Sequence, residues 1–270
     1  MKILVTGGSG FVGGHLIKHL SNAGYNDIFC LDLKQGKDIC DYNLIAEYFK
    51  NVDYVFHLAA EVRIQETLED PALATKTNAL GTSIILRLAK ENNVKRVIFS
   101  STAAAYTDTP NPYSITKLFG EEYCKMYTKL FGLETVIFRY FNIYGEGQPI
   151  EGQYAPVIGK FLKQKAYKQP ITIVGDGSQK RDFIHVSDVA KANIAALDFE
   201  NKKIVGETFD IGTGKPYTIL DIKNMIGGEH INLPPRKAEI KTSVADITKT
   251  LKYLNWKPEI KLENWIQKVI

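Results

Sequence analysis

The chain has 270 residues, of which 44% are hydrophobic and 24% charged. This composition is that of a folded globular protein and excludes a disordered chain. Its 34 basic and 30 acidic residues give a net charge of +4, which is too small and too scattered to predict nucleic-acid binding.

The cysteines and the apolar segments indicate the compartment. Cys30, Cys40 and Cys124 are few and widely spaced, a pattern that favours a reducing compartment over a disulfide framework or a metal site. No apolar run reaches the roughly 18 residues of a membrane span, and the N-terminal run leads into glycines instead of a cleavage site. We expect a cytoplasmic protein with no bound metal and no membrane or nucleic-acid partner.

The first 145 residues alternate short apolar runs with amphipathic stretches. The predicted strands are 2–5, 28–31, 54–58, 96–100 and 135–139, and the predicted helices are 11–23, 71–92 and 113–131. Continuous apolar runs are typical of strands that are covered on both faces, and alternating strands and helices give right-handed crossovers. The pattern predicts an α/β fold of the Rossmann class, a doubly wound parallel sheet with helices on both faces.

After residue 145 this rhythm loosens. Prolines interrupt the chain, a strand is predicted at 171–174, a helix from Ser187 to about 198, and another strand at 208–211. We therefore predict a first domain of residues 1–145, to which 183–205 returns. A smaller C-terminal α/β domain would consist of 146–182 and 206–270.

A glycine-rich segment, Gly7-Gly8-Ser9-Gly10-Phe11-Val12-Gly13, joins the first strand to the first helix. A helix N-terminus presents unpaired N–H groups, and glycines let the backbone approach a pyrophosphate. Glycines alone would fit a tight turn, but Asp32 follows 19 residues after Gly13, as in dinucleotide-binding folds. We expect Asp32 to bind ribose hydroxyls and to favour NAD over NADP; a plain loop aspartate is the alternative, and Lys34 nearby leaves the cofactor choice open.

Tyr113 and Lys117 lie four residues apart at the start of a predicted helix, and therefore on one face of it. A free tyrosine has a pKa near 10 and is a poor base at neutral pH. A neighbouring ammonium and a cationic nicotinamide would lower that pKa. The spacing occurs by chance in many helices, but Ser100-Ser101-Thr102 at the preceding strand end, where such sheets bind ligands, supports a catalytic site.

Together these motifs resemble the extended short-chain dehydrogenase/reductase family, specifically its NAD-dependent nucleotide-sugar epimerase/dehydratase branch. The resemblance covers nearly the whole chain. The other matching segments are Asp38-Ile39, His57-Leu58-Ala59-Ala60, Asn78 with Gly81-Thr82, Arg139-Tyr140-Phe141-Asn142, Gly175-Asp176-Gly177, Gln179 and Arg181-Asp182-Phe183-Ile184-His185-Val186.

The resemblance implies roles for individual residues. Thr102 would hydrogen-bond the reacting hydroxyl, Tyr113 would be the base, and Lys117 would hold the ribose and tune the tyrosine. The residues implied to contact NAD are Gly7, Gly10, Phe11, Val12, Gly13, Asp32, Asp38, Ile39, Leu58, Ala59, Ala60, Asn78, Ser100, Tyr113, Lys117 and Tyr140. Those implied to contact the substrate are Thr102, Asn142, Arg181, Arg236 and Ser243.

Two further groups of residues have competing interpretations. Arginine can grip a diphosphate bidentately, but a surface ion pair is the alternative for both Arg181 and Arg236. His57 and His185 could be read as general bases. Both lie in apolar strand contexts, and the resemblance makes them structural.

The segment after Thr102 indicates the reaction. Dehydratases of the resembled family carry Asp-Glu there, and decarboxylases a glutamate; this chain has Ala103 and Ala104, neither of which can transfer a proton. The resemblance therefore implies a 4-epimerase of UDP-hexoses (UDP-glucose and UDP-galactose) that forms a 4-keto intermediate with NAD. The resemblance also places Ser243 at the position whose size governs whether N-acetylated sugars fit, and a small serine there implies that these sugars are accepted as well.

Two other functions stay open. A nucleotide-sugar reductase would use the same residues but exchange its cofactor, and an NAD-binding scaffold would share the fold without catalysis. The resemblance also suggests a homodimer formed through the helices near 71–92 and 113–131.

Overall fold

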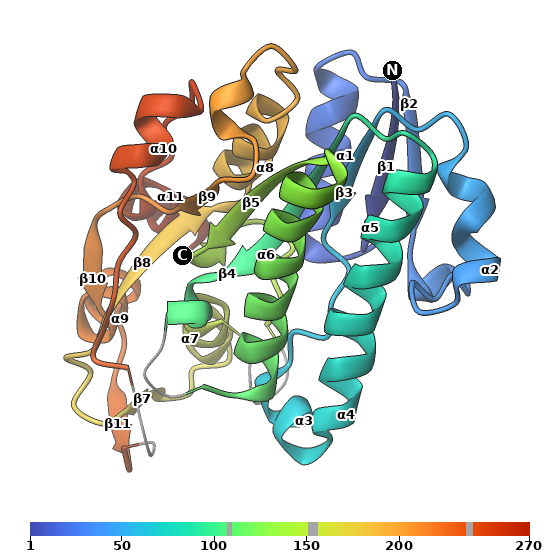
Figure 1. Ribbon diagram of the computed structural model, residues 1–270. Coiled ribbons are helices and arrows are strands. Elements are labelled where there is room, and N and C mark those ends of the chain that lie inside the picture. The colour runs from blue at the N-terminus through green and yellow to red at the C-terminus, as the bar shows by residue number, and fades with distance from the viewer. Residues whose placement is uncertain (107–109, 151–155, 236–239) are drawn as a thin grey trace.

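The computed structural model describes residues 1–106, 110–150, 156–235 and 240–270. Its main sheet has six strands in the order β2-β1-β3-β4-β5-β9, and every neighbouring pair is parallel (Figure 1). These strands are β1 (Lys2–Thr6), β2 (Asp27–Leu31), β3 (Tyr54–His57), β4 (Arg96–Thr102), β5 (Glu134–Tyr140) and β9 (Thr208–Ile211). The predicted parallel sheet is confirmed, with strand ends within two residues of the predicted ones.

Helices cover both faces of the main sheet (Figure 1). One face carries α1 (Phe11–Asn22) and α8 (Val186–Ala195), and the other carries α5 (Gly81–Glu91) and α6 (Pro112–Phe131). Side chains alternate along a strand, so β1 sends Val5 to the first face and Leu4 to the second. Within the described residues, none of the helices combines the length and the apolar character needed to cross a bilayer.

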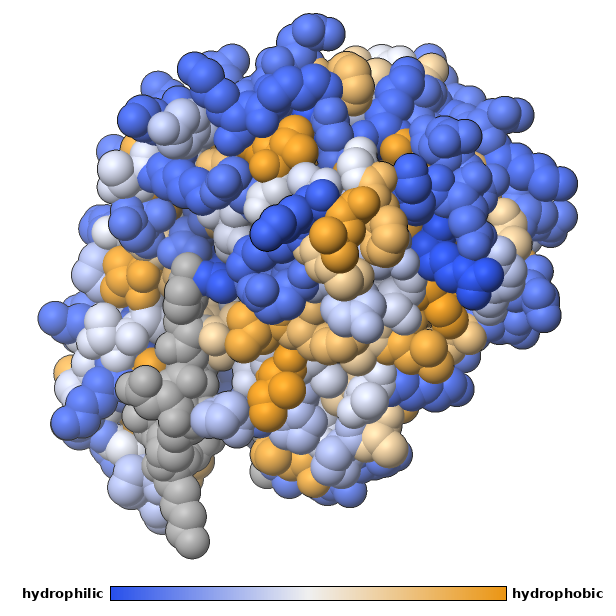
Figure 2. Space-filling model, viewed as in Figure 1, coloured by the Kyte–Doolittle hydropathy of each residue, from blue (hydrophilic) through white to orange (hydrophobic). Residues whose placement is uncertain are grey.

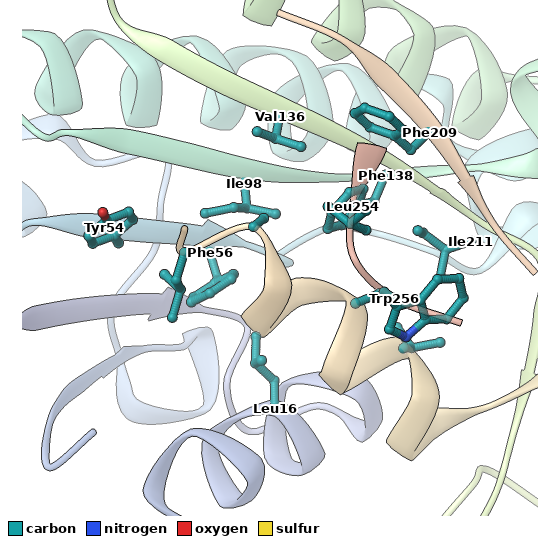
Figure 3. Close-up of a cluster of buried hydrophobic side chains, with 14 of the residues drawn as sticks. Leu16, Tyr54, Phe56, Ile98, Val136, Phe138, Phe209, Ile211, Leu254 and Trp256 are labelled. Carbon is teal, nitrogen blue, oxygen red and sulfur yellow. The ribbon is translucent and has the colours of Figure 1, made fainter. Parts of the chain in front are cut away.

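The core on the α1 side also takes in the C-terminal part of the chain (Figure 3). Leu16 of α1 belongs to the same buried cluster as Phe56 and Phe138 of the sheet, and so do Leu254 and Trp256. The indole Nε1 of Trp256 donates to the Asp188 carbonyl at 2.9 Å. Trp256, from the C-terminal part of the chain, thus belongs to the core of the main sheet.

A second region packs beside the main sheet around its own apolar cluster, which includes Tyr144, Phe161, Ile173 and Trp265. Its strands are β6 (Asn142–Tyr144), β7 (Ile171–Val174), β8 (Lys180–His185), β10 (Pro216–Thr218), β11 (His230–Leu233) and β12 (Thr242–Ser243). They form the order β10-β8-β12 with β6 on β8, and a separate pair β11-β7. Its helices are α7 (Val157–Ala166), α9 (Ile219–Ile226) and α11 (Leu262–Val269).

The main sheet extends further along the chain than expected. The segment 206–270 was assigned to the smaller domain, yet β9 pairs with β5 at the edge of the main sheet. Phe209 and Ile211 are apolar and fully covered there, and α10 (Thr248–Tyr253) packs on β9. The strand β9 thus covers the edge of β5, which would otherwise present unpaired backbone groups.

The predicted helix 71–92 is divided into three parts. It consists of α4 (Pro71–Ala74), a π-helical segment over Thr75–Leu80, and α5, and it follows two short helices that were not predicted, α2 (Tyr42–Ile45) and α3 (Ile64–Glu69). The π-helical segment contains Asn78, whose side chain is buried and bonded to the Glu61 backbone at 2.8 and 3.0 Å and to Thr116 Oγ1 at 3.1 Å. A π-turn of this kind often marks a functional region.

Candidate active site

A cavity of about 800 Å³ lies at the carboxyl ends of the main strands and is closed on its other side by the second region. Ligands bind such sheets at this edge. The predicted site residues that line it are Gly7, Gly10, Phe11, Val12, Gly13, Asp32, Asp38, Ile39, Leu58, Ala59, Ala60, Ser100, Thr102, Tyr113, Lys117, Tyr140, Asn142, Arg181 and Ser243. Asn78 is not among the lining residues, and Arg236 lies outside the described residues.

The glycine segment packs closely against the neighbouring backbone at Gly7 and Gly13. Gly7 has φ of +74°, and a Cβ there would lie 2.7 Å from the Ala59 amide nitrogen. A Cβ on Gly13 would lie 2.3 Å from the Gly7 carbonyl oxygen. Gly10 caps α1 without a side-chain hydrogen bond, so the first amides of α1 stay available to an anion. These contacts fit the pyrophosphate of a dinucleotide.

Asp32 connects the end of β2 to this segment. Its Oδ2 accepts from the Ser9 amide and its Oδ1 from the Lys34 amide, both at 2.9 Å. Asp38, further along the same wall, accepts from the Cys40 amide at 2.9 Å, and this hydrogen bond lowers the pKa of its carboxyl. The wall therefore carries two carboxylates where an adenosine would lie, which fits NAD.

The residues that resemble a catalytic set meet where β4 ends beside α6. Asn111 starts this helix with a capping box shared with Ser114, and Tyr113 and Lys117 follow on the face toward the cavity. The side chain of Thr102 lowers the pKa of Tyr113, which places the two side chains near each other at this point of the cavity. The Lys117 ammonium donates to the Ser100 carbonyl at 2.8 Å.

Burial acts on the pKa values of both residues of this pair. It raises the pKa of Tyr113, while the side chain of Thr102 lowers it. It lowers the pKa of Lys117 to about 8. In both residues burial disfavours the charged form, so the positive charge expected to favour the Tyr113 phenolate includes that of a bound nicotinamide.

The substrate side of the cavity comes from β6, β8 and β12. The Asn142 amide donates to the Asp182 carbonyl at 2.7 Å. The Arg181 guanidinium donates to the Lys180 and Ile240 carbonyls at 2.8 and 2.7 Å. Ser243 is the register partner of Arg181. Asn142, Arg181 and Ser243 are thus brought together from segments about 40 and 60 residues apart, as the resemblance implies.

The two histidines lie outside the cavity. His57 is buried between Thr6 Oγ1 at 2.7 Å and Thr82 Oγ1 at 2.9 Å, and burial lowers its pKa to about 3. His185 caps α8 through its Nδ1, which accepts from the Ser187 amide at 3.2 Å. The helix therefore begins one residue before the predicted cap at Ser187, because the histidine ring does the capping.

Several lining residues were not predicted. They are Lys37, Glu61, Phe141, Ile143, Pro149, Pro156 and Ile240, among others. Phe141 belongs to a segment that matches the resembled family, and Glu61 directly follows one. The match therefore contained the signal for both residues, although neither was assigned to the site. Ile240 carries no such signal, because only the tertiary fold brings it to Arg181.

Comparisons with known proteins agree with this geometry. A protein of Methanocaldococcus jannaschii, provisionally named a UDP-glucose 4-epimerase, is 37% identical over 99% of this chain and 97% of its own length. A UDP-glucuronate 4-epimerase of Thermodesulfobacterium geofontis is 31% identical over 99% of this chain and 94% of its own length. The crystal structure of the Thermotoga maritima UDP-glucose 4-epimerase with UDP-glucose has a TM-score of 0.90, at 31% identity over 99% of this chain and 96% of that one.

The sequence model of one family also matches residues 3–212, which include the glycine segment, the Tyr113–Lys117 pair and Arg181. This match spans the main sheet from β1 to β9. With the cavity, the cradle for a dinucleotide and the relatives, it leads to one conclusion: the chain belongs to the NAD-dependent epimerase/dehydratase family of enzymes.

Proposed function

We propose that this enzyme is a UDP-hexose 4-epimerase that interconverts UDP-glucose and UDP-galactose. The observation that carries the proposal is that Ala103 and Ala104 line the cavity directly after Thr102. A dehydratase or decarboxylase needs an acid at this point to move a proton. Oxidation at C4 followed by reduction needs only the hydroxyl contacts, a base and NAD.

One acid does line this part of the cavity. The Glu61 carboxylate accepts from Arg63 Nε at 2.9 Å and Nη2 at 2.8 Å. Burial raises the pKa of Glu61, but the hydrogen bonds from Arg63 hold it below its usual range. A carboxylate kept ionised in this way is a poor proton donor at neutral pH, so Glu61 does not replace the missing acid.

In the proposed reaction Tyr113 accepts the proton of the sugar 4-hydroxyl, and the Thr102 hydroxyl orients that group. The glycine segment and Asp32 would hold NAD, which would supply the hydride acceptor and donor at C4 and a positive charge that favours the Tyr113 phenolate. Lys117, which now donates to the Ser100 carbonyl, would hold the nicotinamide ribose from the same position on α6.

The sugar ring must turn so that both of its faces can react. The enzyme therefore has to bind the substrate through its nucleotide diphosphate and not through the sugar. Asn142 and Arg181 lie in the cavity wall opposite the glycine segment and offer an amide and a guanidinium to a diphosphate. Ser243 is small and partly exposed beside Arg181. We expect this position to admit an N-acetyl group, so UDP-N-acetylhexosamines are further substrates.

The test is a panel of UDP-glucose, UDP-galactose, UDP-N-acetylgalactosamine and UDP-glucuronate with added NAD, with the products separated by chromatography. We expect the first two to interconvert without net NADH formation. Stoichiometric NADH, or a 4-keto product released into solution, would indicate a reductase instead. No turnover of any sugar, with NAD still bound, would leave a binding scaffold. Turnover of UDP-glucuronate alone would contradict UDP-glucose and UDP-galactose as the substrates and would indicate a UDP-glucuronate 4-epimerase.

The homodimer is a second part of the proposal. Leu80, Ile115 and Leu118 on the π-helical segment and α6 are 49%, 55% and 40% exposed, and Figure 2 shows apolar surface in this part of the molecule. Packing of these helices against the same helices of a second copy would bury the three side chains. Light scattering should give twice the chain mass, and Leu118→Glu should halve it; a monomeric wild type would contradict this.

A further inference from the structure

An ion pair that the proposed mechanism does not use lies directly behind the catalytic helix. Glu121 of α6 is fully buried. Its carboxylate accepts from Arg139 Nε at 2.7 Å, from Arg139 Nη2 at 2.5 Å and from the Ser101 hydroxyl at 2.5 Å. One side chain thus joins α6 to both β4 and β5, which lie under this helix in Figure 1.

Each partner of Glu121 is next to a residue of the proposed site. On the helix, Glu121 is four residues after Lys117 and eight after Tyr113, and therefore on the same face. On β4, Ser101 stands between Ser100, whose carbonyl accepts from Lys117, and Thr102, whose side chain lowers the pKa of Tyr113. Movement of Glu121 would therefore displace both ends of the catalytic set relative to each other.

The backbone of α6 also packs directly against β4, at Gly120. A Cβ on Gly120 would lie 2.4 Å from the Phe99 ring, so the helix backbone rests against that ring. A buried ion pair adds little stability compared with apolar groups of the same size. The ion pair at this contact is therefore better explained by the arrangement that it enforces than by the energy that it contributes.

We propose that Glu121 is a positioning residue for the proposed epimerase reaction: it locks α6 to the end of β4 and thereby holds Lys117 and Thr102 in their reactive arrangement. It acts through Lys117 and Ser101 and touches no reacting atom itself. The inference rests on the proposed function, although part of its test does not.

The charged groups around Glu121 determine how a loss of its negative charge would change the pKa of Lys117. Burial raises the pKa of the Glu121 carboxyl and the Ser101 hydroxyl lowers it, while the bidentate Arg139 favours the ionised form. Burial lowers the pKa of Lys117, and Cys124 and Glu121 oppose this. The other charged groups that act on Glu121 are Glu122 and Lys125 on its own helix and Asp210 on β9.

The matched control is the ion pair at the other end of the same two strands. Arg96 of β4 is fully buried, and its Nε and Nη2 donate to Glu134 of β5 at 3.1 and 2.7 Å. Arg96 and Glu134 are register partners, as Ser101 and Arg139 are. The Glu134 pair therefore has the same chemistry in the same strands but lies far from the cavity.

The experiment compares Glu121→Gln with Glu134→Gln. For Glu121→Gln we expect kcat to fall about tenfold with KM for UDP-glucose within about twofold, and the alkaline limb of the kcat–pH profile to move to lower pH. In protein labelled with ¹³Cε-lysine, the titration midpoint of Lys117, assigned by its loss in Lys117→Met, should fall by about one pH unit. Glu134→Gln should lower the melting temperature but leave kcat and the Lys117 midpoint unchanged.

Several results would overturn the proposal. They are an unchanged kcat and Lys117 midpoint in folded Glu121→Gln, or an equal loss of kcat in Glu134→Gln, which would make both pairs merely structural. If Glu121→Gln does not fold, Ser101→Ala replaces it, with an expected several-fold loss of kcat at unchanged KM; full activity there contradicts the proposal. A wild type without turnover would refute the proposed function, whereas the Lys117 midpoint would still test Glu121.

Discussion

In the half of the cavity that the main sheet builds, close packing fixes the lining groups. Gly7 and Gly13 leave no space for a methyl group against Ala59 and the Gly7 carbonyl, and Lys117 is buried with its ammonium on a strand carbonyl. In the half that the second region builds, the strands β6 and β12 have three and two residues. Asn142 there is exposed, and its amide is held by a backbone carbonyl.

This difference suggests that the two halves of the cavity have different roles. The rigid half holds a cofactor that does not change, whereas short strands and polar side chains can be altered without disturbing the sheet. The solved structures fit this view, because those named for UDP-glucose and for UDP-glucuronic acid 4-epimerases both resemble this fold, with TM-scores of 0.90 and 0.87 at 31% and 28% identity. Substitutions in the two halves should therefore fail in different ways.

Tyr113→Phe tests the rigid half at its chemical centre and should have the largest effect. It removes the base but keeps the ring, so we expect kcat to fall about a thousandfold while NAD binding stays within about twofold, as measured by fluorescence titration. Tyr123→Phe, on the same helix but stacked on Phe119 away from the cavity, is the control and should be fully active. Full activity of Tyr113→Phe would refute the proposed mechanism.

Gly13→Ala against Gly14→Ala tests the packing of that half. A Cβ on Gly13 would meet the Gly7 carbonyl oxygen at 2.3 Å, whereas on Gly14 the nearest atom is 3.8 Å away. We expect Gly13→Ala to weaken NAD binding about a hundredfold because the glycine segment must shift. Gly14→Ala should bind NAD normally and gain about 0.5–1 kcal/mol in free energy of unfolding, since alanine favours a helix. Equal NAD affinity in the two variants would contradict the packing argument.

The same contrast explains what the sequence could predict. The glycine segment, Asp32 and the Tyr113–Lys117 pair are local patterns, so their element and their role follow from neighbours in the chain. Contacts between segments that are distant in the chain were harder to predict from the sequence. The pairing of β9 with β5, the packing of Trp256 under the main sheet and the Glu121–Arg139 pair depend on residues 18 to more than 100 positions apart. No spacing or composition identifies such partners.

The candidate substrate residues illustrate both cases. Arg181 was identified through a matching segment, and the structure places it in the cavity wall. The position of Ile240, whose carbonyl holds its guanidinium, became visible only in the fold. Asn78 matched a segment too, yet it is buried within the π-helical segment, where its amide bonds the Glu61 backbone instead of lining the cavity.

Arg181→Lys tests the substrate half. Lysine keeps the charge but not the planar fork, so the diphosphate loses a bidentate contact. We expect KM for UDP-glucose to rise about tenfold with NAD binding unchanged, as initial rates and a separate NAD titration would show. Lys180→Ala, at the exposed neighbouring position, should leave KM unchanged. An effect of Arg181→Lys on NAD affinity would mean that the two halves are not independent.

The smallest expected effect is on the free energy of unfolding at acid pH. It depends on two buried histidines, one in each half of the molecule. His57 lies between two neutral threonine hydroxyls, and burial lowers its pKa to about 3. At His185, beside the second region, burial also lowers the pKa, but the Glu146 carboxylate at 3.2 Å opposes it. The main-sheet histidine is therefore the more strongly held in its neutral form.

In the unfolded chain the ring of His57 takes up a proton with an ordinary pKa of about 6.5. Its contribution to stability is therefore complete above pH 6.5 and is lost as the pH falls toward 3, since only the unfolded chain is protonated in between. At pH 5.5 the loss should be roughly 1–2 kcal/mol relative to pH 8. Urea unfolding of the wild type and His57→Gln at both pH values measures it: glutamine can still bond both threonines, so the variant should lose less stability on acidification. An equal loss in the two proteins would place the acid-sensitive group elsewhere, and the same pair of measurements on His185→Gln would show whether it lies at the border of the second region.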